Sequence, residues 1–244
     1  MQTQAVIGHI TGWLKDYALN ARAKGFVVGV SGGIDSAVVS ALAARTGLSV
    51  LLLDMPIRQK ANQSDRAQEH IRNLTRLFPN VSGQTVDLTP TFDTFAATVE
   101  AGGSEFPDKQ LALANARSRL RMVTLYYYGQ LHGCLVTGTG NKIEDFGVGF
   151  FTKYGDGGVD ISPIADLTKT QVYQLAAELG VAESIQKAVP TDGLWDIERT
   201  DEEQMGASYP ELEWAMSVYG TAKPEDFEGR RREVLEIYTR LHKA

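Results

Sequence analysis

The chain has 244 residues, of which 43% are hydrophobic and 22% charged, values that fit a globular protein with a buried core. Its net charge is −6. The single cysteine, Cys134, excludes an internal disulfide or a cysteine-built zinc site and fits a reducing cytoplasm. We find no run of eighteen apolar residues, no secretory signal pattern and no broad basic stretch, so we expect no membrane span and no nucleic-acid partner.

The distribution of apolar residues predicts short buried strands that alternate with helices. Predicted helices cover residues 6–17, 34–44, 60–78, 108–131 and 168–180, and predicted strands cover 25–31, 48–53, 84–88 and 133–140, with a further apolar segment at 160–164. This alternation is typical of an α/β fold, a doubly wound, parallel five-stranded sheet with helices on both faces, as in Rossmann-like proteins. No repeat or low-complexity linker interrupts the chain, so residues 1–244 are expected to form a single domain.

Three groups of small or polar residues each follow a predicted strand. They are residues 31–33, Asp54 and residues 137–140. In a parallel α/β sheet the ligand binds beyond the carboxyl ends of the strands, where these groups would converge. The sequence therefore predicts a single site at one edge of the sheet.

The segment GVSGGIDS, residues 29–36, is the strongest signal of function. Gly32 and Gly33 allow a tight turn that brings backbone N–H groups close to a ligand, and the helix that follows points its N-terminus at the same place. Ser31 and Ser36 add hydroxyl donors. Together these features predict a cradle for pyrophosphate.

Asp35 stands apart within this segment, because an acid in a phosphate cradle repels the ligand unless a cation lies between them. The arrangement therefore implies Mg²⁺. The simpler alternative is a plain Gly-Gly turn, with Asp35 as a carboxylate favoured in the first turn of a helix. The segment resembles the pyrophosphate loop of the N-type ATP pyrophosphatases, which split ATP between the α- and β-phosphates and activate a substrate oxygen as an adenylate. The loop predicts this reaction class but not the substrate.

Three later segments resemble the ammonia-dependent NAD synthetases in particular. Residues 114–122, ANARSRLRM, resemble that family's arginine helix; residues 138–164, which include TKYGDGG, are close to a signature of it; and residues 189–216 follow its pattern of Pro-Thr, Leu-Trp, Asp-Glu and Gly-x-x-Tyr. The resemblance implies a carbon–nitrogen ligase that converts deamido-NAD, ATP and ammonia to NAD, AMP and pyrophosphate through a deamido-NAD adenylate. It also implies an adenine nucleotide alpha-hydrolase-like fold and a homodimer. We expect no separate glutaminase domain, because 244 residues leave no room for one beside the ligase.

The resemblance also assigns roles to individual residues. It implies ATP contacts at Gly29, Val30, Ser31, Gly32, Gly33, Ile34, Asp35, Ser36, Thr139, Lys169 and Thr191. It implies deamido-NAD contacts at Arg119, Lys153, Asp160, His242 and Lys243, and Mg²⁺ ligands at Asp35 and Glu144. Catalysis is expected to depend on Asp35, on Lys169, which would offset charge on the leaving pyrophosphate, and on Asp160, either as a proton acceptor from ammonium or as a substrate contact.

Two positions depart from the family's pattern. The family places a His-Lys pair near its C-terminus that closes over the substrate, and here His242-Lys243 lacks the proline-containing tail expected beyond it. Either this pair is the clasp, or the clasp has been lost from a truncated chain. One extra residue also lies between Glu144 and Lys153. Candidate dimer surfaces are the opening helix and the tyrosines at 126–128, both of which could instead be core.

Several of these segments have a structural alternative. Arg117, Arg119 and Arg121 predict phosphate or carboxylate partners, whereas a solvated helix face with intrahelical pairs is the alternative. The glycine-rich residues 155–158 are typical of a mobile lid over a reactive adenylate, and a flexible surface loop is the alternative. For the acidic residues at 202–203, a helix cap is the favoured interpretation.

Three other functional interpretations fit the residues less well. A tRNA thiolase generally needs cysteine pairs and a basic RNA face, and a chain with one cysteine and a net charge of −6 has neither. A nucleotide sensor without turnover would be expected to lose Asp35, Glu144 or Lys169, and all three are present. A flavoprotein-like carrier explains neither the carboxylate pair nor TKYGDGG.

Overall fold

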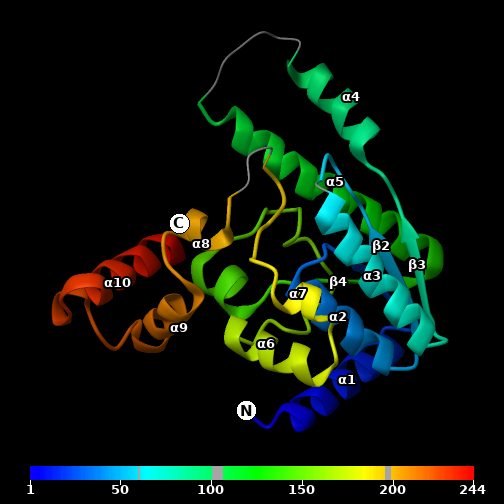
Figure 1. The fold of residues 1–244 in the computed structure, drawn as a ribbon, viewed down its shortest axis with the longest axis horizontal. Helices are drawn as coiled ribbons and strands as arrows, with labels where there is room; N and C mark the ends of the chain where they lie inside the picture. The colour runs from blue at the N-terminus through cyan, green and yellow to red at the C-terminus, as the bar shows by residue number, and fades with distance from the viewer. Residues whose placement is uncertain (60, 101–106, 196–198) are drawn as a thin grey trace.

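The computed structural model describes residues 1–59, 61–100, 107–195 and 199–244. Within these residues, four strands form one parallel sheet in the order β3-β2-β1-β4 (Figure 1). The strands are β1 (Gly25–Gly29), β2 (Ser49–Asp54), β3 (Val81–Thr85) and β4 (Cys134–Thr137). The continuous apolar runs of β1 and β2 are buried on both faces, as expected for strands in the middle of a parallel sheet. The predicted α/β fold with a parallel sheet is confirmed.

The predicted number of five strands is wrong, because the described residues form four. The segment at 160–164 makes only an isolated parallel bridge between Thr137 and Ile161. In this bridge Ile161 N–H donates to Val136 O and Gly138 N–H donates to Ile161 O. The next donor in this register would be residue 163, which is Pro163 and has no N–H, so the ladder cannot continue.

The edge strand β3 lies three residues earlier than predicted. It pairs with β2 from Val81, opposite Val50, to Thr85, opposite Asp54. Only Val81 of this strand is buried. A polar edge strand carries no apolar run, and the alternating Val86 and Leu88 just beyond it shifted the prediction along the chain.

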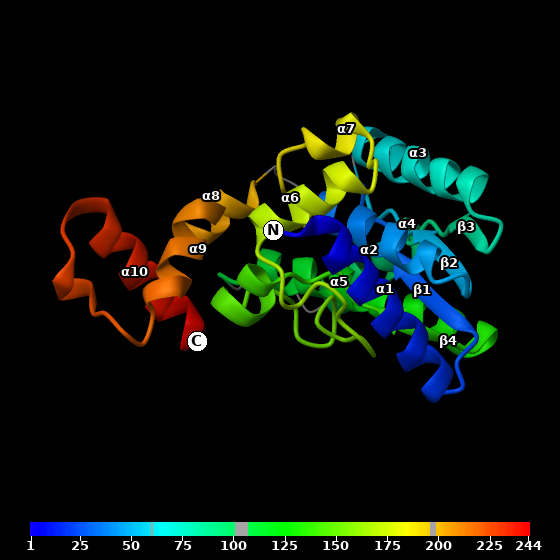
Figure 2. The ribbon, with the colours of Figure 1, turned by 90° about the horizontal axis from the view of Figure 1, so that it is seen from below.

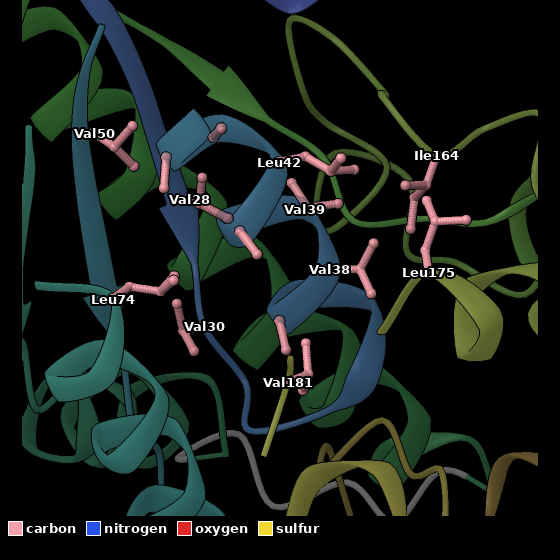
Figure 3. Close-up of a cluster of buried hydrophobic side chains, with 14 of the residues drawn as sticks. Val28, Val30, Val38, Val39, Leu42, Val50, Leu74, Ile164, Leu175 and Val181 are labelled. Carbon is pink, nitrogen blue, oxygen red and sulfur yellow. The ribbon is translucent and has the colours of Figure 1, made fainter. Parts of the chain in front are cut away.

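One face of the sheet is covered by four helices whose apolar sides meet in a single cluster. These helices are α1 (Thr3–Asn20), α2 (Ile34–Arg45), α3 (Ala61–Leu77) and α6 (Lys169–Glu178), followed by the short α7 (Glu183–Gln186). Figure 3 shows Val28 and Val50 of the sheet on one side of α2, while Val38 and Leu42 of α2 point to the other side, toward Ile164 and Leu175. Helix α2 is buried almost all round because it is packed between strands and helices.

The opposite face is covered by α4 (Thr89–Glu100) and by the long α5 (Lys109–His132), which passes behind the strands in Figure 1. A second cluster joins Val27, Leu51 and Val136 of the strands to Phe92 of α4 and to Leu120 of α5. The sheet is therefore doubly wound. None of the described helices is both long and apolar enough to span a membrane.

The C-terminal part of the chain forms a lobe to one side of the sheet layers (Figure 2). It consists of α8 (Asp201–Met205), α9 (Tyr209–Val218), η2 (Pro224–Asp226) and α10 (Gly229–His242), which pack with the π-helix η1 (Lys142–Val148). Its core is a third cluster that includes Ile143, Leu212 and Tyr238. Arg230 and Arg232 lie on its surface in exposed ion pairs, so that part of α10 is a solvated face.

Candidate functional site

The predicted phosphate loop connects the carboxyl end of β1 to the N-terminus of α2. Its two serines brace it from within: Ser31 N–H donates to Ser36 Oγ at 3.2 Å, the two hydroxyls lie 3.1 Å apart, and Gly33 N–H donates to Ser31 Oγ. Gly33 is the N-cap of α2, so the free N–H groups and positive dipole end of this helix face the loop. The local structure is an anion cradle of the predicted kind.

Gly32 is required at its position for two reasons. Its φ of +77° is in the left-handed region, and a Cβ there would lie 2.5 Å from Gln63 O of α3. The loop and the first turns of α3 are therefore in direct backbone contact. Arg66 of α3 strengthens this contact, because its Nε donates to Gly32 O at 3.2 Å.

Lys169 joins two carboxylates beside this loop. Its Nζ lies 2.6 Å from Asp35 Oδ2 and 2.9 Å from Glu144 Oε1, and the lysine is only 3% exposed. Asp35 comes from α2, Glu144 from η1, and Lys169 from the first position of α6, where Thr168 caps the helix. The structure thus brings together the three residues that the sequence predicted as the metal and phosphate machinery.

Burial and charge act in opposite directions in this cluster. Burial alone would lower the pKa of Lys169, but the Asp35 and Glu144 carboxylates outweigh it and hold this pKa above its ordinary value. Burial raises the pKa of Glu144, and Lys169 opposes that rise. Lys169 is therefore a cation at neutral pH.

Further residues, to which the sequence analysis gave no role, hold the two carboxylates in place. Asn141 Nδ2 donates to Asp35 Oδ1 at 3.1 Å, while its Oδ1 accepts the N–H of Glu144. Tyr209, the first residue of α9, donates its hydroxyl to Glu144 Oε1 at 2.5 Å, and the same hydroxyl lies 3.2 Å from Asp201 Oδ2. The only sequence signal for Tyr209 was its place in the family's Gly-x-x-Tyr pattern.

Two more carboxyl groups near this cluster have pKa values that are raised to near neutral pH. Burial, followed by the charge of Glu144, raises the pKa of Asp201 to about 7. Burial, followed by the charges of Asp156, Glu144 and Asp35, raises the pKa of Asp145 to about 8. Both residues line the cavity described next, so its acidic wall does not carry its full formal charge at pH 7.

A cavity opens at the carboxyl ends of β1, β2 and β4. All eleven residues predicted to bind ATP line it: Gly29, Val30, Ser31, Gly32, Gly33, Ile34, Asp35, Ser36, Thr139, Lys169 and Thr191. Thr191 reaches it from the segment before α8, where its Oγ1 donates to Arg199 O. The predicted convergence of the segments after β1, β2 and β4 on one edge is therefore observed.

The residues predicted to bind the dinucleotide lie elsewhere. Arg119 is exposed on α5 and donates from Nε to Lys153 O at 3.1 Å, and Lys153 Nζ lies over the ring of Tyr154. Asp160 accepts from Val136 N–H and from the hydroxyl of Tyr126 on α5. These three predicted residues are outside the lining of the cavity and lie along the outer side of α5.

The predicted clasp lies at the end of α10. His242 Nδ1 is 2.6 Å from Gly147 O of η1, and its ring stacks on Tyr238 at a centroid distance of 5.6 Å. Lys243 is exposed. In this arrangement His242 joins the C-terminal helix to η1, and neither residue lines the cavity, so a contact with substrate remains a prediction.

The other arginines of α5 contact carbonyl groups. Arg117 donates to Leu194 O, and its guanidinium lies 4.5 Å from the ring centroid of Phe92. Arg121 donates from Nε to Met55 O at 3.1 Å. A solvated helix face is therefore wrong for these two, while Arg119 is exposed. Glu203 forms a capping box with Thr200, as the sequence favoured.

A family model described as NAD synthase matches residues 6–240 of the chain. The chain belongs to the NAD synthase family. Its relatives include the NH(3)-dependent NAD(+) synthetase of Finegoldia magna, which is 37% identical over 218 residues that cover 89% of this chain and 86% of that protein.

Solved structures of the family share the fold. The NMN synthetase of Francisella tularensis superposes with a TM-score of 0.85 and is 33% identical over 100% of this chain and 94% of that one. The NAD+ synthetase of Burkholderia pseudomallei superposes with a TM-score of 0.75 at 26% identity, over 98% of this chain and 88% of that one.

Proposed function

We propose that this NAD synthase family member is an ATP-dependent amide-forming ligase that converts deamido-NAD and ammonia to NAD, with AMP and pyrophosphate as the other products. The observation that carries the proposal is the cluster of Asp35, Glu144 and Lys169 at the foot of the phosphate loop. A glycine-rich anion cradle next to paired carboxylates and a buried lysine suits a reaction in which negative charge accumulates on a leaving pyrophosphate.

The two carboxylates fit Mg²⁺. Asp35 and Glu144 converge on one cation, the Lys169 ammonium, so the position between them already favours positive charge. No group of three or more metal-ligating side chains occurs among the described residues, but Mg²⁺ commonly takes only one or two carboxylates and completes its shell with phosphate and water. A bound Mg²⁺ would neutralise charge between the phosphates of ATP. Asp35 and Glu144 are the residues that would hold it.

The protein's own groups mainly position reactants and neutralise charge. In the first step, the nicotinate carboxylate attacks the α-phosphorus of ATP and the bond to pyrophosphate breaks, while the N–H groups of the loop and Lys169 bind the leaving group. In the second step, ammonia attacks the carbonyl carbon of the mixed anhydride and AMP leaves. Ammonium must lose a proton before this attack, and Asp160 keeps its two predicted roles, proton acceptor or substrate contact.

A second copy of the chain would complete the dinucleotide site. Arg119, Val123, Tyr126 and Tyr127 follow one another at i, i+4, i+7 and i+8, so they share one side of α5. This stripe, the α5 stripe, is exposed although three of its members are apolar or aromatic. A patch of this kind is typical of an interface, and Arg119 and Asp160 lie beside its apolar residues. A homodimer built on α5 would bring these polar groups into an enclosed site.

One observation favours a second candidate substrate. The Francisella tularensis NMN synthetase resembles this chain over its full length at 33% identity. Amidation of nicotinic acid mononucleotide uses the same carboxylate chemistry on a smaller acceptor. The ratio of kcat/KM for the mononucleotide to that for deamido-NAD distinguishes the two candidates directly.

The test of the proposed function is an assay of the purified chain with Mg²⁺, ATP, ammonium and either acceptor, in which amide product, AMP and pyrophosphate are followed together. We expect equimolar formation of all three. Asp35→Ala should abolish all three, whereas the control Asp16→Ala, an exposed acid on α1, should not. Formation of ADP, or no amide from either acceptor, would contradict the proposal.

A further inference from the structure

Arg66 lies where the phosphate loop meets α3. Its Nε donates to Gly32 O at 3.2 Å, and its Cβ lies 3.3 Å from the position that a Cβ on Gly32 would take. The side chain is half-buried and lines the same cavity as the loop. The guanidinium is therefore fixed at the edge of the anion cradle by a residue of the cradle itself.

The charged residues that line the cavity show why the position of Arg66 matters. Among the described lining residues, seven are Asp or Glu and three are Arg or Lys. Of the three cations, Lys169 is paired with two carboxylates, and Arg121 is held against Met55 O. The described part of the chain contains no ion pair of Arg66. Arg66 is thus a cation of the cavity whose charge no carboxylate of the described residues neutralises.

The geometry points to Arg66 as a further phosphate-binding residue, which binds the β- and γ-phosphates of ATP and then the leaving pyrophosphate. This inference rests on the proposed function, since it takes the loop to be the pyrophosphate site. Arginine has five N–H donors, and the bond to Gly32 uses only one of them. The remaining donors form a planar fork that matches phosphate oxygens, and such charge-assisted bonds are stronger than neutral ones.

The tether to Gly32 also lowers the cost of binding. A free arginine side chain loses rotamer freedom when it binds a ligand, whereas one already held at its Nε loses less. Because of the same tether, phosphate binding by Arg66 is linked to the conformation of the loop. A variant that keeps the tether but not the charge therefore separates positioning from direct binding.

The experiment measures the affinity of the full chain for inorganic pyrophosphate and for AMP by calorimetric titration at constant Mg²⁺, together with the KM for ATP. Arg66→Ala removes charge and tether, Arg66→Gln keeps a donor for Gly32 O without the charge, and Arg66→Lys keeps the charge without the planar fork of donors. The matched control is Arg72→Ala, an exposed arginine on the same helix. Circular dichroism checks that each variant is folded.

We expect Arg66→Ala and Arg66→Gln to weaken pyrophosphate binding by about 10- to 100-fold and to raise the KM for ATP similarly, as for loss of a charge-assisted hydrogen bond. Arg66→Lys should recover part of this loss. Affinity for AMP, which lacks the β- and γ-phosphates, should change less than about twofold in all variants, as should every constant of Arg72→Ala.

Three results would overturn the inference. Unchanged pyrophosphate binding by Arg66→Ala excludes a contact. Wild-type affinity in Arg66→Gln, or an equal loss of AMP and pyrophosphate affinity in Arg66→Ala, shows that Arg66 only shapes the loop. A wild-type chain that binds neither ATP nor pyrophosphate is a different outcome, because it removes the proposed function and the inference with it.

Discussion

The phosphate loop and the outer side of α5 both carry predicted ligand contacts, and they differ in how complete they are. At the phosphate loop, buried Lys169 pairs with the half-buried carboxylates of Asp35 and Glu144, and further hydrogen bonds come from Asn141 and Tyr209. On the outer side of α5, the predicted dinucleotide contacts are exposed next to the apolar α5 stripe. The first region is assembled by the folding of one chain. The second has the exposed apolar side chains of a surface that forms a complete site only when another molecule covers it.

This difference predicts where substitutions act on the folded chain itself and where they act on assembly. In a buried ionic cluster, removal of one member leaves the others desolvated and unpaired. On an exposed face, the same kind of change costs the monomer little. The four predictions below test this contrast, from the largest expected effect to the smallest.

Lys169→Met should have the largest effect. It leaves two carboxylates close together without their cation, and we expect a loss of about 3–5 kcal/mol in the free energy of unfolding. We also expect kcat/KM to fall by about 100- to 1000-fold, since charge on the leaving pyrophosphate is no longer offset. Urea denaturation and steady-state kinetics measure the two effects. The control is Lys187→Met, because the Lys187–Glu183 pair is exposed and should contribute less than about 0.5 kcal/mol. A stable and active Lys169→Met protein would contradict the importance of the cluster.

Gly32→Ala should rank next. The new Cβ meets Gln63 O at 2.5 Å in a backbone conformation that L residues rarely adopt, so we expect the unfolding free energy to fall by about 2–4 kcal/mol. Gly47 is the matched control, with a φ of +75° and open space around its Cβ position. Gly47→Ala should therefore cost only the backbone strain, about 1–2 kcal/mol. Equal losses in the two variants would mean that the contact between the loop and α3 contributes nothing.

A buried histidine behind the loop should make stability depend on pH. Burial lowers the pKa of His70 to about 4, and its Nε2 lies 2.8 Å from Ser40 Oγ, which in turn donates to Ser36 O. Because the folded-state pKa is below that of the unfolded chain, the unfolded state binds more protons as pH falls below about 6.5. This histidine should therefore cost about 2 kcal/mol of stability between pH 7 and pH 5.

Urea denaturation at these two pH values measures the effect. His70→Gln should remove most of this pH-dependent loss, whereas His9→Gln, which replaces an exposed histidine of α1, should keep it. If both variants lose stability on acidification as the wild type does, the effect comes from other groups.

Tyr127→Asp should have the smallest effect on the monomer and a clear one on assembly. Tyr127 is 63% exposed in the α5 stripe, so its replacement should change the unfolding free energy of the isolated chain by less than about 0.5 kcal/mol. A charge within an apolar interface should nevertheless weaken the proposed homodimer, which sedimentation velocity measures. Leu77→Asp is the control, because Leu77 is 64% exposed at the end of α3, away from the stripe. Identical sedimentation of both variants and wild type would exclude the α5 stripe as the interface.

The parts of the fold that the sequence predicted are those with a strong local pattern. The strands β1, β2 and β4 are continuous apolar runs that end in glycine or polar residues, and their positions were predicted to within a few residues. The edge strand β3 buries only Val81, and α4 buries only Phe92 and Ala96, so neither carries a clear periodic signal. The absence of a fifth strand depends on Pro163 at one position of the register, which no apolar pattern reveals.

The same division applies to the site. The phosphate loop was predictable because its functional groups all come from eight consecutive residues. Tyr209, Asn141 and Arg66 are ordinary residue types in ordinary helices or loops, and each becomes part of the site through a partner far away in the sequence. Only the three-dimensional structure places Tyr209 on Glu144 or Arg66 on Gly32. The resemblance to a family predicted which residues contact ligands, but not which residues hold those predicted contacts in position.

The members of the ionic cluster are far apart in the sequence, and this separation determines when the cluster can form during synthesis. Asp35 meets Lys169 across 134 positions, and Tyr209 joins them from still further along. Contacts with such large sequence separation form late, because the chain must close long loops before they are made. As synthesis proceeds from the N-terminus, β1 and the phosphate loop emerge long before their cation does. A nascent chain or proteolytic fragment that ends before α6 therefore lacks Lys169, and the complete cluster requires the chain up to Tyr209.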